Sequence, residues 1–338
     1  MYEVAKSAER EELFINTASK MKIDVALVEK DFWICLTLDY LFSKSKWKNS
    51  LIFKGGTSLS KVYNIIERFS EDIDLILDWR VLGYKTNEPW EARSKTKQLK
   101  FIDELRNRLF NFLQNDFMPT FKKDMEELLN TQVNIYISND DLGTICFAYP
   151  RFFEDKSILR IIRLEIGALA AWSPAKKMKI HSYAAEYYPN VFSKSETEVL
   201  TTTIERTFWE KATILHQEAN RPKESTIPAR YSRHYYDVYC IFKSHFYKNA
   251  LKDKKLLREV VEFKDKFYPR LWARYDLAKE GKIKLYPASH SIENLQQDYE
   301  KMRAMIYGDY PQFEDILACL RILEKLMKNS LNKQTNTY

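Results

Sequence analysis

The sequence predicts an α+β fold, in which a first part with mixed elements is followed by a mainly helical part. Apolar runs of strand length alternate with segments of helical period up to about residue 200. Nearly all later segments space their apolar residues as helices do. The chain has 338 residues with only 7 Gly and 10 Pro, which allows two domains without long linkers. We expect domains at 1–200 and 201–330, followed by a frayed tail at 331–338.

The first part begins with two helices and continues with a strand, a turn, a helix and a second strand. Helices are expected over 6–20 and 24–43, with Asp24 as the N-cap of the second helix. The next stretch, LIFKGGTSLSKVYNIIERFSEDIDLIL, contains two apolar runs separated by a glycine turn and a helical segment. It predicts a strand at 50–54, a turn at 55–57, a helix at 58–66 and a strand at 72–78.

The remaining elements are predicted from the same two periods. Before residue 200 we expect a loop at 79–90, helices at 91–115 and 120–129, and strands at 132–137, 144–149 and 158–166. Thr202 and Glu205 fit a capping box, which places the next helix start near residue 203. The later helices are expected at 232–246, 251–279, 291–306 and 312–329.

The glycine turn has the composition of a phosphate-binding turn. Gly55 and Gly56 are followed by the hydroxyl residues Thr57 and Ser58, between an apolar run and a helical segment. Glycines allow backbone N–H groups to approach a phosphate closely, and a helix start favours an anion. The turn matches neither the Walker A loop nor the GxGxxG pattern. An ordinary strand-to-helix turn is the alternative interpretation.

Two carboxylates lie one residue apart in the second apolar run. Side chains alternate along a strand, so Asp72 and Asp74 should lie on the same face. Their mutual repulsion is most simply relieved by a divalent cation. Nucleotidyl transfer uses such cations and a third acid, for which Glu165 in the run ILRIIRLEI is the candidate. Glu165 could instead form an ion pair with Arg160 or Arg163.

A lysine falls within an apolar helical face in the second part. Ile204, Phe208 and Leu215 share that face with Lys211, which could steady a triphosphate. The alternative is a lysine whose head group reaches water past an apolar surface.

Arg233 and Asp237 are four residues apart on the next predicted helix. They could form a surface ion pair, or Asp237 could instead hold Lys211 or the proton that leaves the acceptor. The five histidines have no metal-binding spacing, and no motif supports Ser/His/Asp catalysis.

Positive charge is concentrated in one segment. Between residues 243 and 284 the chain has 13 Lys and Arg against 6 Asp and Glu, an excess equal to the net charge of +7 of the whole chain. Aromatic residues are interleaved with these charges: Phe263, Phe267, Tyr268, Trp272 and Tyr275. This combination favours an RNA partner, since bases stack on such rings. The alternatives are a solvated helical surface for the charges and a buried helix face for the rings.

Redox and targeting features indicate a cytoplasmic protein. The four cysteines, Cys35, Cys146, Cys240 and Cys319, form no CxxC pair and no disulfide framework. The N-terminal residues MYEVAKSAER contain no apolar signal segment, and no run reaches membrane-spanning length.

Several motifs together resemble the nucleotidyltransferase toxins of the AbiEii/AbiGii type, within the polymerase-β-like nucleotidyltransferase superfamily. These motifs are FKGGTSLSK, RFSEDIDL, RLEI, ERTFWEKATILH and RHYYDVY, and the similarity starts near Glu29-Lys30-Asp31. The resemblance implies a mixed sheet with flanking helices and a helical C-terminal part that contributes to the active site. It also implies transfer of NMP from an NTP with Mg²⁺, or with Mn²⁺ in its place.

The resemblance further implies a role and a set of site residues. Such proteins are toxins of bacterial toxin–antitoxin or abortive-infection systems, restrained by an antitoxin encoded beside them, and some members modify the tRNA acceptor end and block translation. Asp72, Asp74 and Glu165 would bind the metal, and Lys211 and Asp237 would complete the catalytic set. The nucleotide would be contacted by Gly55, Gly56, Thr57, Ser58, Ser70, Lys211 and Arg233. Transfer to a small molecule or a protein side chain, or a non-catalytic nucleotide- or RNA-binding module, are the alternatives.

Overall fold

The computed structural model describes residues 7–153, 160–168 and 174–332. It divides into two compact units, which are described separately. The first unit holds the sheet and consists of Met1–Val62 and Ser70–Thr202. The second unit is mainly helical and consists of Tyr63–Phe69 and Thr203–Tyr338.

The short segment Tyr63–Phe69 belongs to the second unit, although the chain on both sides of it belongs to the first. The sequence did not predict this exchange. The domain limits at 1–200 and 201–330 remain a proposal. Of the expected tail, 333–338 lies outside the described residues, and the last helix runs to Asn332.

The first unit is built on a mixed sheet, as expected. In the described residues the sheet has seven strands in the order β3-β4-β5-β2-β1-β7-β6. The β1–β7 and β2–β5 pairs are parallel and the other pairs are antiparallel. The strands are β1 (Leu51–Lys54), β2 (Asp72–Leu77), β3 (Asn134–Ile137), β4 (Thr144–Ala148), β5 (Ile162–Gly167), β6 (Ala175–Ile180) and β7 (Thr197–Thr202).

Burial explains which runs form the centre and which form the edge of this sheet. Leu51, Ile52 and Phe53 of β1 are fully buried, as expected for a strand that is covered on both faces. The edge strand β6 reads AKKMKI, and its lysines discourage pairing with another chain. The central strands therefore form the core that supports the site.

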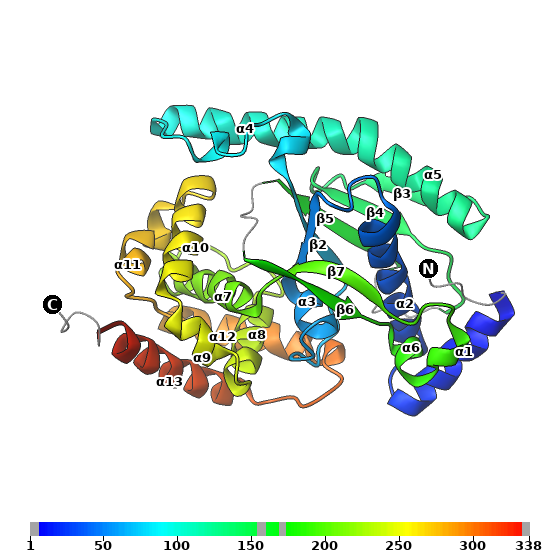
Figure 1. Ribbon diagram of the computed structural model, residues 1–338. Helices are drawn as coiled ribbons and strands as arrows, with labels where there is room; N and C mark the ends of the chain where they lie inside the picture. Colours follow the sequence, from blue (N-terminus) through cyan, green and yellow to red (C-terminus); the bar gives the residue numbers. More distant parts are fainter. Residues whose placement is uncertain (1–6, 154–159, 169–173, 333–338) are drawn as a thin grey trace. The chain divides into compact units, whose positions relative to one another are not determined.

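Helices pack around the sheet of the first unit. Asp24 caps α2 as predicted, because its side chain accepts a hydrogen bond from the N–H of Ala26 at 2.7 Å. Figure 1 shows α2 beside the sheet with α1 and α6 next to it, and α2 contacts β5 and β7. The helices of this unit are α1 (Ser7–Met21), α2 (Val25–Asp39), α3 (Gly55–Lys61), α4 (Lys95–Phe112), α5 (Met118–Leu129) and α6 (Tyr183–Tyr187).

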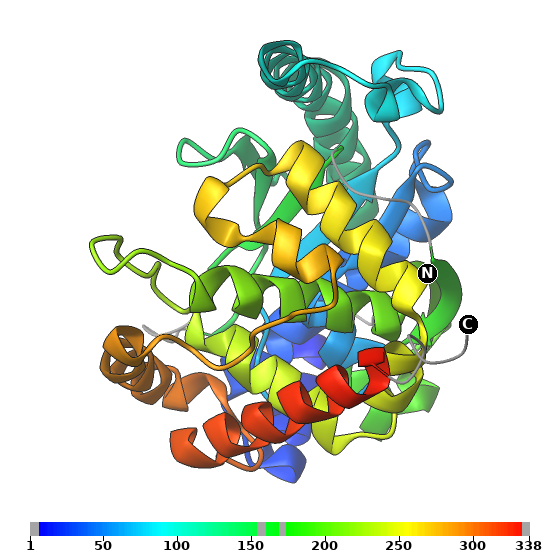
Figure 2. The same cartoon turned by 90° about the vertical axis from the view of Figure 1, so that its left-hand side faces the viewer.

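The second unit is a set of packed helices, as predicted. Its central helix, α7, contacts α8, α9 and α10. Figure 2 shows α10 in yellow and α13 in red within this unit. Its helices are α7 (Ile204–Ala219), α8 (Ser232–Lys243), α9 (Tyr247–Lys252), α10 (Lys254–Phe267), α11 (Tyr275–Lys279), α12 (Ile292–Lys301) and α13 (Phe313–Asn332). In the described residues, every helix is too short or too polar to cross a bilayer.

Short helical turns complete the described chain. Two π-helical turns follow α2 and α4, and 3₁₀ turns lie in the loops. The π turns are Tyr40–Lys44 and Leu113–Phe117, and the 3₁₀ turns are Trp79–Leu82, Glu88–Trp90, Pro189–Val191, Leu271–Ala273, Ser289–Ser291 and Arg303–Met305.

Several predicted boundaries are wrong. The expected turn at 55–57 is already the first turn of α3, and the helix expected over 58–66 ends at Lys61. Thr202 lies in β7, and the N-cap of α7 is Thr203, whose side chain accepts from the N–H of Arg206 at 3.4 Å. The helix expected at 251–279 is interrupted after Phe267. The strand predicted to start at 158 begins at Ile162, and 158–159 lie outside the described residues.

Candidate active site

The three predicted acids meet on one face of the sheet. Asp72 and Asp74 alternate along β2 with the buried Ile73. The parallel β2–β5 register places Asp74 beside Glu165 and Asp72 beside Arg163. The acid cluster, defined as Asp72, Asp74 and Glu165, thus occupies neighbouring positions on two central strands.

Arg163 lies between two of these acids. Its Nε is 3.6 Å from Asp72 Oδ1, and its Nη2 is 3.7 Å from Glu165 Oε1. The side chains of Asp72, Arg163 and Glu165 are 24%, 25% and 39% exposed, so solvent and ligands can reach them. The alternative ion pair between Glu165 and Arg163 is therefore present, and Arg163 lies beside both Asp72 and Glu165 of the acid cluster.

Gly55 makes room for one of the acids. Its φ is +82°, a conformation that favours glycine, and a Cβ at this position would lie 1.8 Å from Asp74 Oδ2. Any other residue would therefore have to displace the Asp74 carboxylate. The first glycine of the GG turn is explained by this close approach at the start of α3.

The hydroxyl groups after the glycines hold the turn together. Thr57 Oγ1 donates to the carbonyl oxygen of Asp72 at 2.5 Å, with the Ser70 oxygen 3.3 Å away. Ser58 Oγ donates to the carbonyl oxygen of Gly55 at 2.8 Å. Thr57 and Ser58 are buried, whereas Ser70 is half-buried. Nucleotide contacts by Gly56, Thr57, Ser58 and Ser70 stay a prediction.

The donor set of the acid cluster suits a divalent cation. In the described residues, no group of three or more His, Cys, Asp or Glu lies ready to enclose a metal ion. Mg²⁺ is usually bound by one or two carboxylates together with water and substrate phosphates, and does not need an all-protein cage. Carboxylates at neighbouring, half-exposed positions next to a glycine turn fit this type of site.

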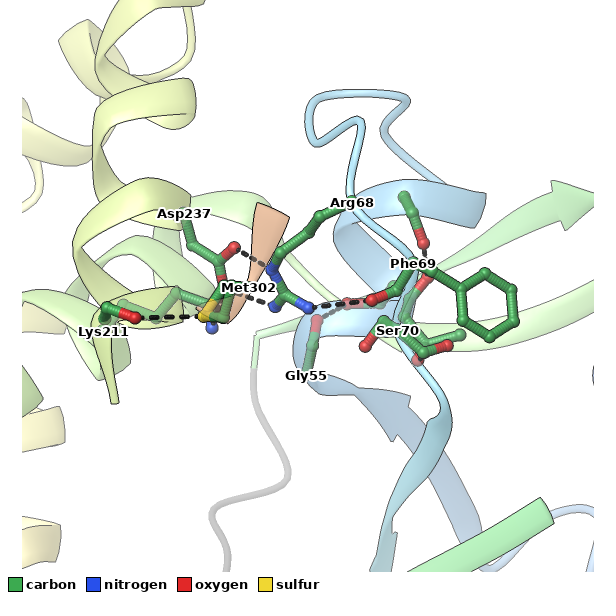
Figure 3. A network of polar contacts seen from close by, with 11 residues as sticks. Gly55, Arg68, Phe69, Ser70, Lys211, Asp237 and Met302 are labelled. Carbon is green, nitrogen blue, oxygen red and sulfur yellow. Dashed lines mark hydrogen bonds and ion pairs between the residues drawn. The ribbon is translucent and has the colours of Figure 1, made fainter. Parts of the chain in front are cut away.

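A second group of charges is buried within the second unit. Arg68 Nε donates to Asp237 Oδ1 at 2.7 Å, and Arg68 Nη2 donates to Asp237 Oδ2 at 2.8 Å. Lys211 Nζ lies 2.6 Å from the same Oδ2. Figure 3 shows the Asp237 carboxylate facing the Arg68 guanidinium. Arg68, Lys211 and Asp237 are named the buried charge cluster.

The charges of this cluster are strongly coupled. Burial by itself would raise the pKa of Asp237, but Arg68 and Lys211 hold that pKa well below its usual range. Burial lowers the pKa of Lys211, and Asp237 offsets only part of this effect. Arg233 also lowers the pKa of Lys211, so three cations share this region with one buried carboxylate. Such an excess of positive charge favours an anionic ligand.

The structure decides between the alternatives for Lys211 and Asp237. Lys211 does not extend to water, because its side chain is buried and paired with Asp237. The surface pair considered for Asp237 is wrong, since Asp237 is fully buried and bound by Arg68 and Lys211. The hypothesis that Asp237 holds Lys211 is confirmed.

Arg68 is the site residue that the sequence prediction missed. It is buried, and it is bonded to a residue 169 positions later in the chain. The sequence feature that could have indicated its role is its position: Arg68 begins the RFSEDIDL motif and lies between the apolar residues Ile66 and Phe69, both of which are buried.

The aromatic residues of the basic segment are mostly buried. Phe263, Phe267 and Tyr275 lie in the helical core, which favours the alternative of a buried face. Tyr268 is exposed, and the half-buried Trp272 lies against the guanidinium groups of Arg221 and Arg270. Base stacking on the first three rings is therefore excluded in this structure.

A search of curated proteins finds no match. Two solved structures are similar over most of their length. MenT4, a nucleotidyltransferase toxin from Mycobacterium tuberculosis H37Rv, has a TM-score of 0.47 and 13% identity, and the match covers 94% of this chain and 97% of MenT4. JHP933 from Helicobacter pylori has a TM-score of 0.44 and 15% identity, with 92% and 96% covered.

The family assignment comes from the sequence. The family model described as "Nucleotidyl transferase AbiEii toxin, Type IV TA system" matches residues 37–319, which is most of the chain. That range contains the acid cluster and the buried charge cluster. The chain belongs to the AbiEii family of nucleotidyltransferase toxins of type IV toxin–antitoxin systems.

Proposed function

We propose that this toxin transfers NMP from an NTP to the 3′ end of tRNA in a reaction that depends on Mg²⁺. The acceptor hydroxyl oxygen bonds to the α-phosphorus of the NTP. The bond from that phosphorus to the bridging oxygen of pyrophosphate breaks, pyrophosphate leaves, and the hydroxyl proton is released. A tRNA modified in this way no longer serves translation, which accounts for toxicity.

The observation that carries this proposal is the acid cluster. Asp72, Asp74 and Glu165 are the residues that would hold the cation, because the sheet register places them at neighbouring positions. A divalent cation held by these residues would neutralise phosphate charge and would lower the pKa of the attacking hydroxyl. A non-catalytic binding module would have little need for three carboxylates at neighbouring positions, with the Arg163 guanidinium between two of them as a counter-charge.

We assign Lys211 and Arg233 to the phosphate groups of the nucleotide. The support for this assignment is the excess of cations around the single carboxylate of Asp237. Asp237 orients Lys211 in this proposal because it forms an ion pair with the ammonium group, and Arg68 holds Asp237 in place. Arg68, Lys211 and Asp237 are buried, and the half-buried Arg233 lies on the same helix as Asp237.

Charge and family support the proposed acceptor and partner. The excess of lysine and arginine in 243–284 supports a polyanionic acceptor such as tRNA. The toxin would act in the cytoplasm, where tRNA is located, and an antitoxin encoded by the adjacent gene would restrain it. Mn²⁺ would replace Mg²⁺, since both are hard cations that accept oxygen ligands.

Label transfer tests this proposal. The purified chain is incubated with Mg²⁺, total tRNA and each α-labelled NTP in turn, next to the Asp74→Asn variant. We expect label in tRNA with at least one NTP for the wild-type chain, and none for Asp74→Asn. Label in a protein or a small molecule, with unlabelled tRNA, would instead establish the alternative acceptors. Equal labelling by both chains would refute the site.

A further inference from the structure

Three consecutive charged residues are buried in α2. Glu29, Lys30 and Asp31 are each at most 1% exposed. Successive side chains of a helix point in directions about 100° apart, so these three side chains face different segments of the structure. Buried charges are tolerated only with partners, and each of these residues has partners in another segment.

Lys30 is bonded next to the acid cluster. Its Nζ lies 2.7 Å from Glu71 Oε2, and the two side chains are 0% and 6% exposed. Glu71 immediately precedes Asp72, the first residue of β2. The backbone of Asp72 is also held from α3, because Thr57 donates to its carbonyl oxygen. The start of β2 is therefore fixed from two sides.

Asp31 is bonded to the end of the helix that follows the glycine turn. Its Oδ1 accepts from Lys61 Nζ at 2.6 Å, and its Oδ2 accepts from the N–H of Tyr183 at 2.7 Å. Lys61 is the last residue of α3, and its ammonium group also lies 3.9 Å from the centroid of the Tyr183 ring. Asp31 thus fixes α3, whose first residue is Gly55.

Glu29 completes the arrangement at the loop after β4. Its two oxygens accept from the N–H groups of Phe152 and Phe153 at 2.8 and 3.2 Å. Residues 29–31 of α2 are thus bonded to the residue before Asp72, to the end of α3, to the N–H of Tyr183 and to the loop after β4.

We propose that Lys30 and Asp31 are positioning residues for the metal and nucleotide site, and this inference rests on the proposed function. Lys30 orients Asp72 through Glu71, and Asp31 orients the glycine turn through Lys61. Neither side chain needs to touch a ligand. At other metal sites, removal of a residue that holds a metal ligand in place lowers the metal affinity about 10- to 100-fold, and we expect an effect of that size when Lys30 or Asp31 is replaced.

The test compares Lys30→Met with a matched control in Mn²⁺ binding followed by electron paramagnetic resonance. The control is Arg221→Met. Arg221 and Glu218 form an ion pair at 2.5 Å, and their side chains are only 8% and 3% exposed. This buried pair contains no residue of the acid cluster or of the buried charge cluster. Lys30→Met should weaken Mn²⁺ binding at least about tenfold, and Lys30→Arg should restore it. Arg221→Met should lower the free energy of unfolding while Mn²⁺ affinity stays unchanged. Amide exchange at residues 70–74 should be faster in Lys30→Met alone.

Two results would overturn the inference, and they are distinguishable. If folded Lys30→Met binds Mn²⁺ as the wild-type chain does, positioning is refuted and the proposed function stands. If the wild-type chain shows no Mn²⁺ binding that is lost in Asp74→Asn, both are refuted. A wild-type chain whose Mn²⁺ binding depends on Lys30 and on Asp74, but which labels no RNA, would support positioning and refute only the acceptor.

Discussion

A single carboxylate holds both cations of the buried charge cluster. Asp237 receives both Arg68 and Lys211, and all three side chains are buried. Removal of this carboxylate would leave two buried cations without a counter-charge, and an unpaired buried cation strongly destabilises the folded state.

Asp237→Asn should therefore lower the free energy of unfolding by about 3–5 kcal/mol, since it leaves Arg68 and Lys211 without their counter-charge. Urea denaturation measures this loss. Asp276→Asn is the control, because Asp276 pairs with Arg274 at the surface, where an ion pair contributes little to stability. If both variants were equally stable, the buried charge cluster would not contribute to stability as described.

Gly55→Ala should disturb the acid cluster directly. The added Cβ would collide with the Asp74 carboxylate, so both stability and Mn²⁺ affinity should fall. Gly83→Ala is a matched control, because Gly83 has a φ of +85° and its Cβ would meet only Arg108 Nη1, at 3.7 Å. Gly83→Ala should lower the free energy of unfolding by about 1–2 kcal/mol through backbone strain alone, and its Mn²⁺ affinity should equal that of the wild-type chain. Equal Mn²⁺ affinity in the two variants would contradict the role of Gly55.

The residues of the site differ in how far the sequence predicts them. Asp72, Asp74 and Glu165 could be found because strand alternation and motif spacing are local properties. The partner of Arg68 could not, since the 169 positions between it and Asp237 are bridged only by tertiary folding. Lys30 and Glu71, likewise, lie in segments whose contact no local pattern predicts.

At the scale of elements, the strands of the acid cluster and their neighbours β1, β3 and β4 were predicted, whereas β7 and β6 at the other edge of the sheet were not. The apolar runs of β1 and β2 are unmistakable, whereas β7 reads TEVLTT. Threonine is favourable in strands, but this run is too polar to predict a central strand. One of its threonine hydroxyl groups is hydrogen-bonded inside the sheet, because Thr201 Oγ1 donates to the carbonyl oxygen of Phe53 at 2.9 Å.

A buried histidine links α7 to the segment around α11. His216 Nδ1 accepts from the N–H of Lys284 at 3.0 Å, and His216 Nε2 lies 3.0 Å from the carbonyl oxygen of Arg274. Burial lowers the pKa of His216, and the nearby Lys284 and Arg274 act in the same direction, while Asp276 and the bond to the Arg274 carbonyl oppose them. Burial likewise lowers the pKa of His234, which lies near Lys211.

These histidines predict a pH dependence of stability. Their folded-state pKa lies below the unfolded-state value of about 6.5, so the unfolded chain binds protons first as the pH falls. The free energy of unfolding should therefore decrease below about pH 6.5, which urea titrations at several pH values measure. His216→Gln should reduce this slope, whereas His290→Gln, at an exposed position, should leave it unchanged. An unchanged slope in His216→Gln would contradict the account.

At the scale of the whole molecule, the net charge of +7 is the property that concerns RNA. Replacing Lys252, Lys254 and Lys255 by Gln should weaken tRNA binding, and it should reduce the salt dependence of binding by up to about one phosphate contact per lysine. Filter binding at several salt concentrations measures both effects.

The matched control for this prediction lies on α4. Lys95, Lys97 and Lys100 are exposed, and their replacement by Gln changes the net charge by the same amount. If the two triple variants bind tRNA with equal affinity and equal salt dependence, the 243–284 segment has no special role, and net charge alone accounts for binding.

The central claim is that the acid cluster transfers a nucleotide to tRNA and that this reaction makes the protein a toxin. Sequencing of RNA 3′ ends after expression without the adjacent gene tests it most directly. The account predicts growth arrest with added nucleotides at tRNA 3′ ends for the wild-type chain. It predicts neither effect for Asp74→Asn expressed at the same level. Growth arrest by Asp74→Asn, or arrest by the wild-type chain with unaltered tRNA ends, would contradict it.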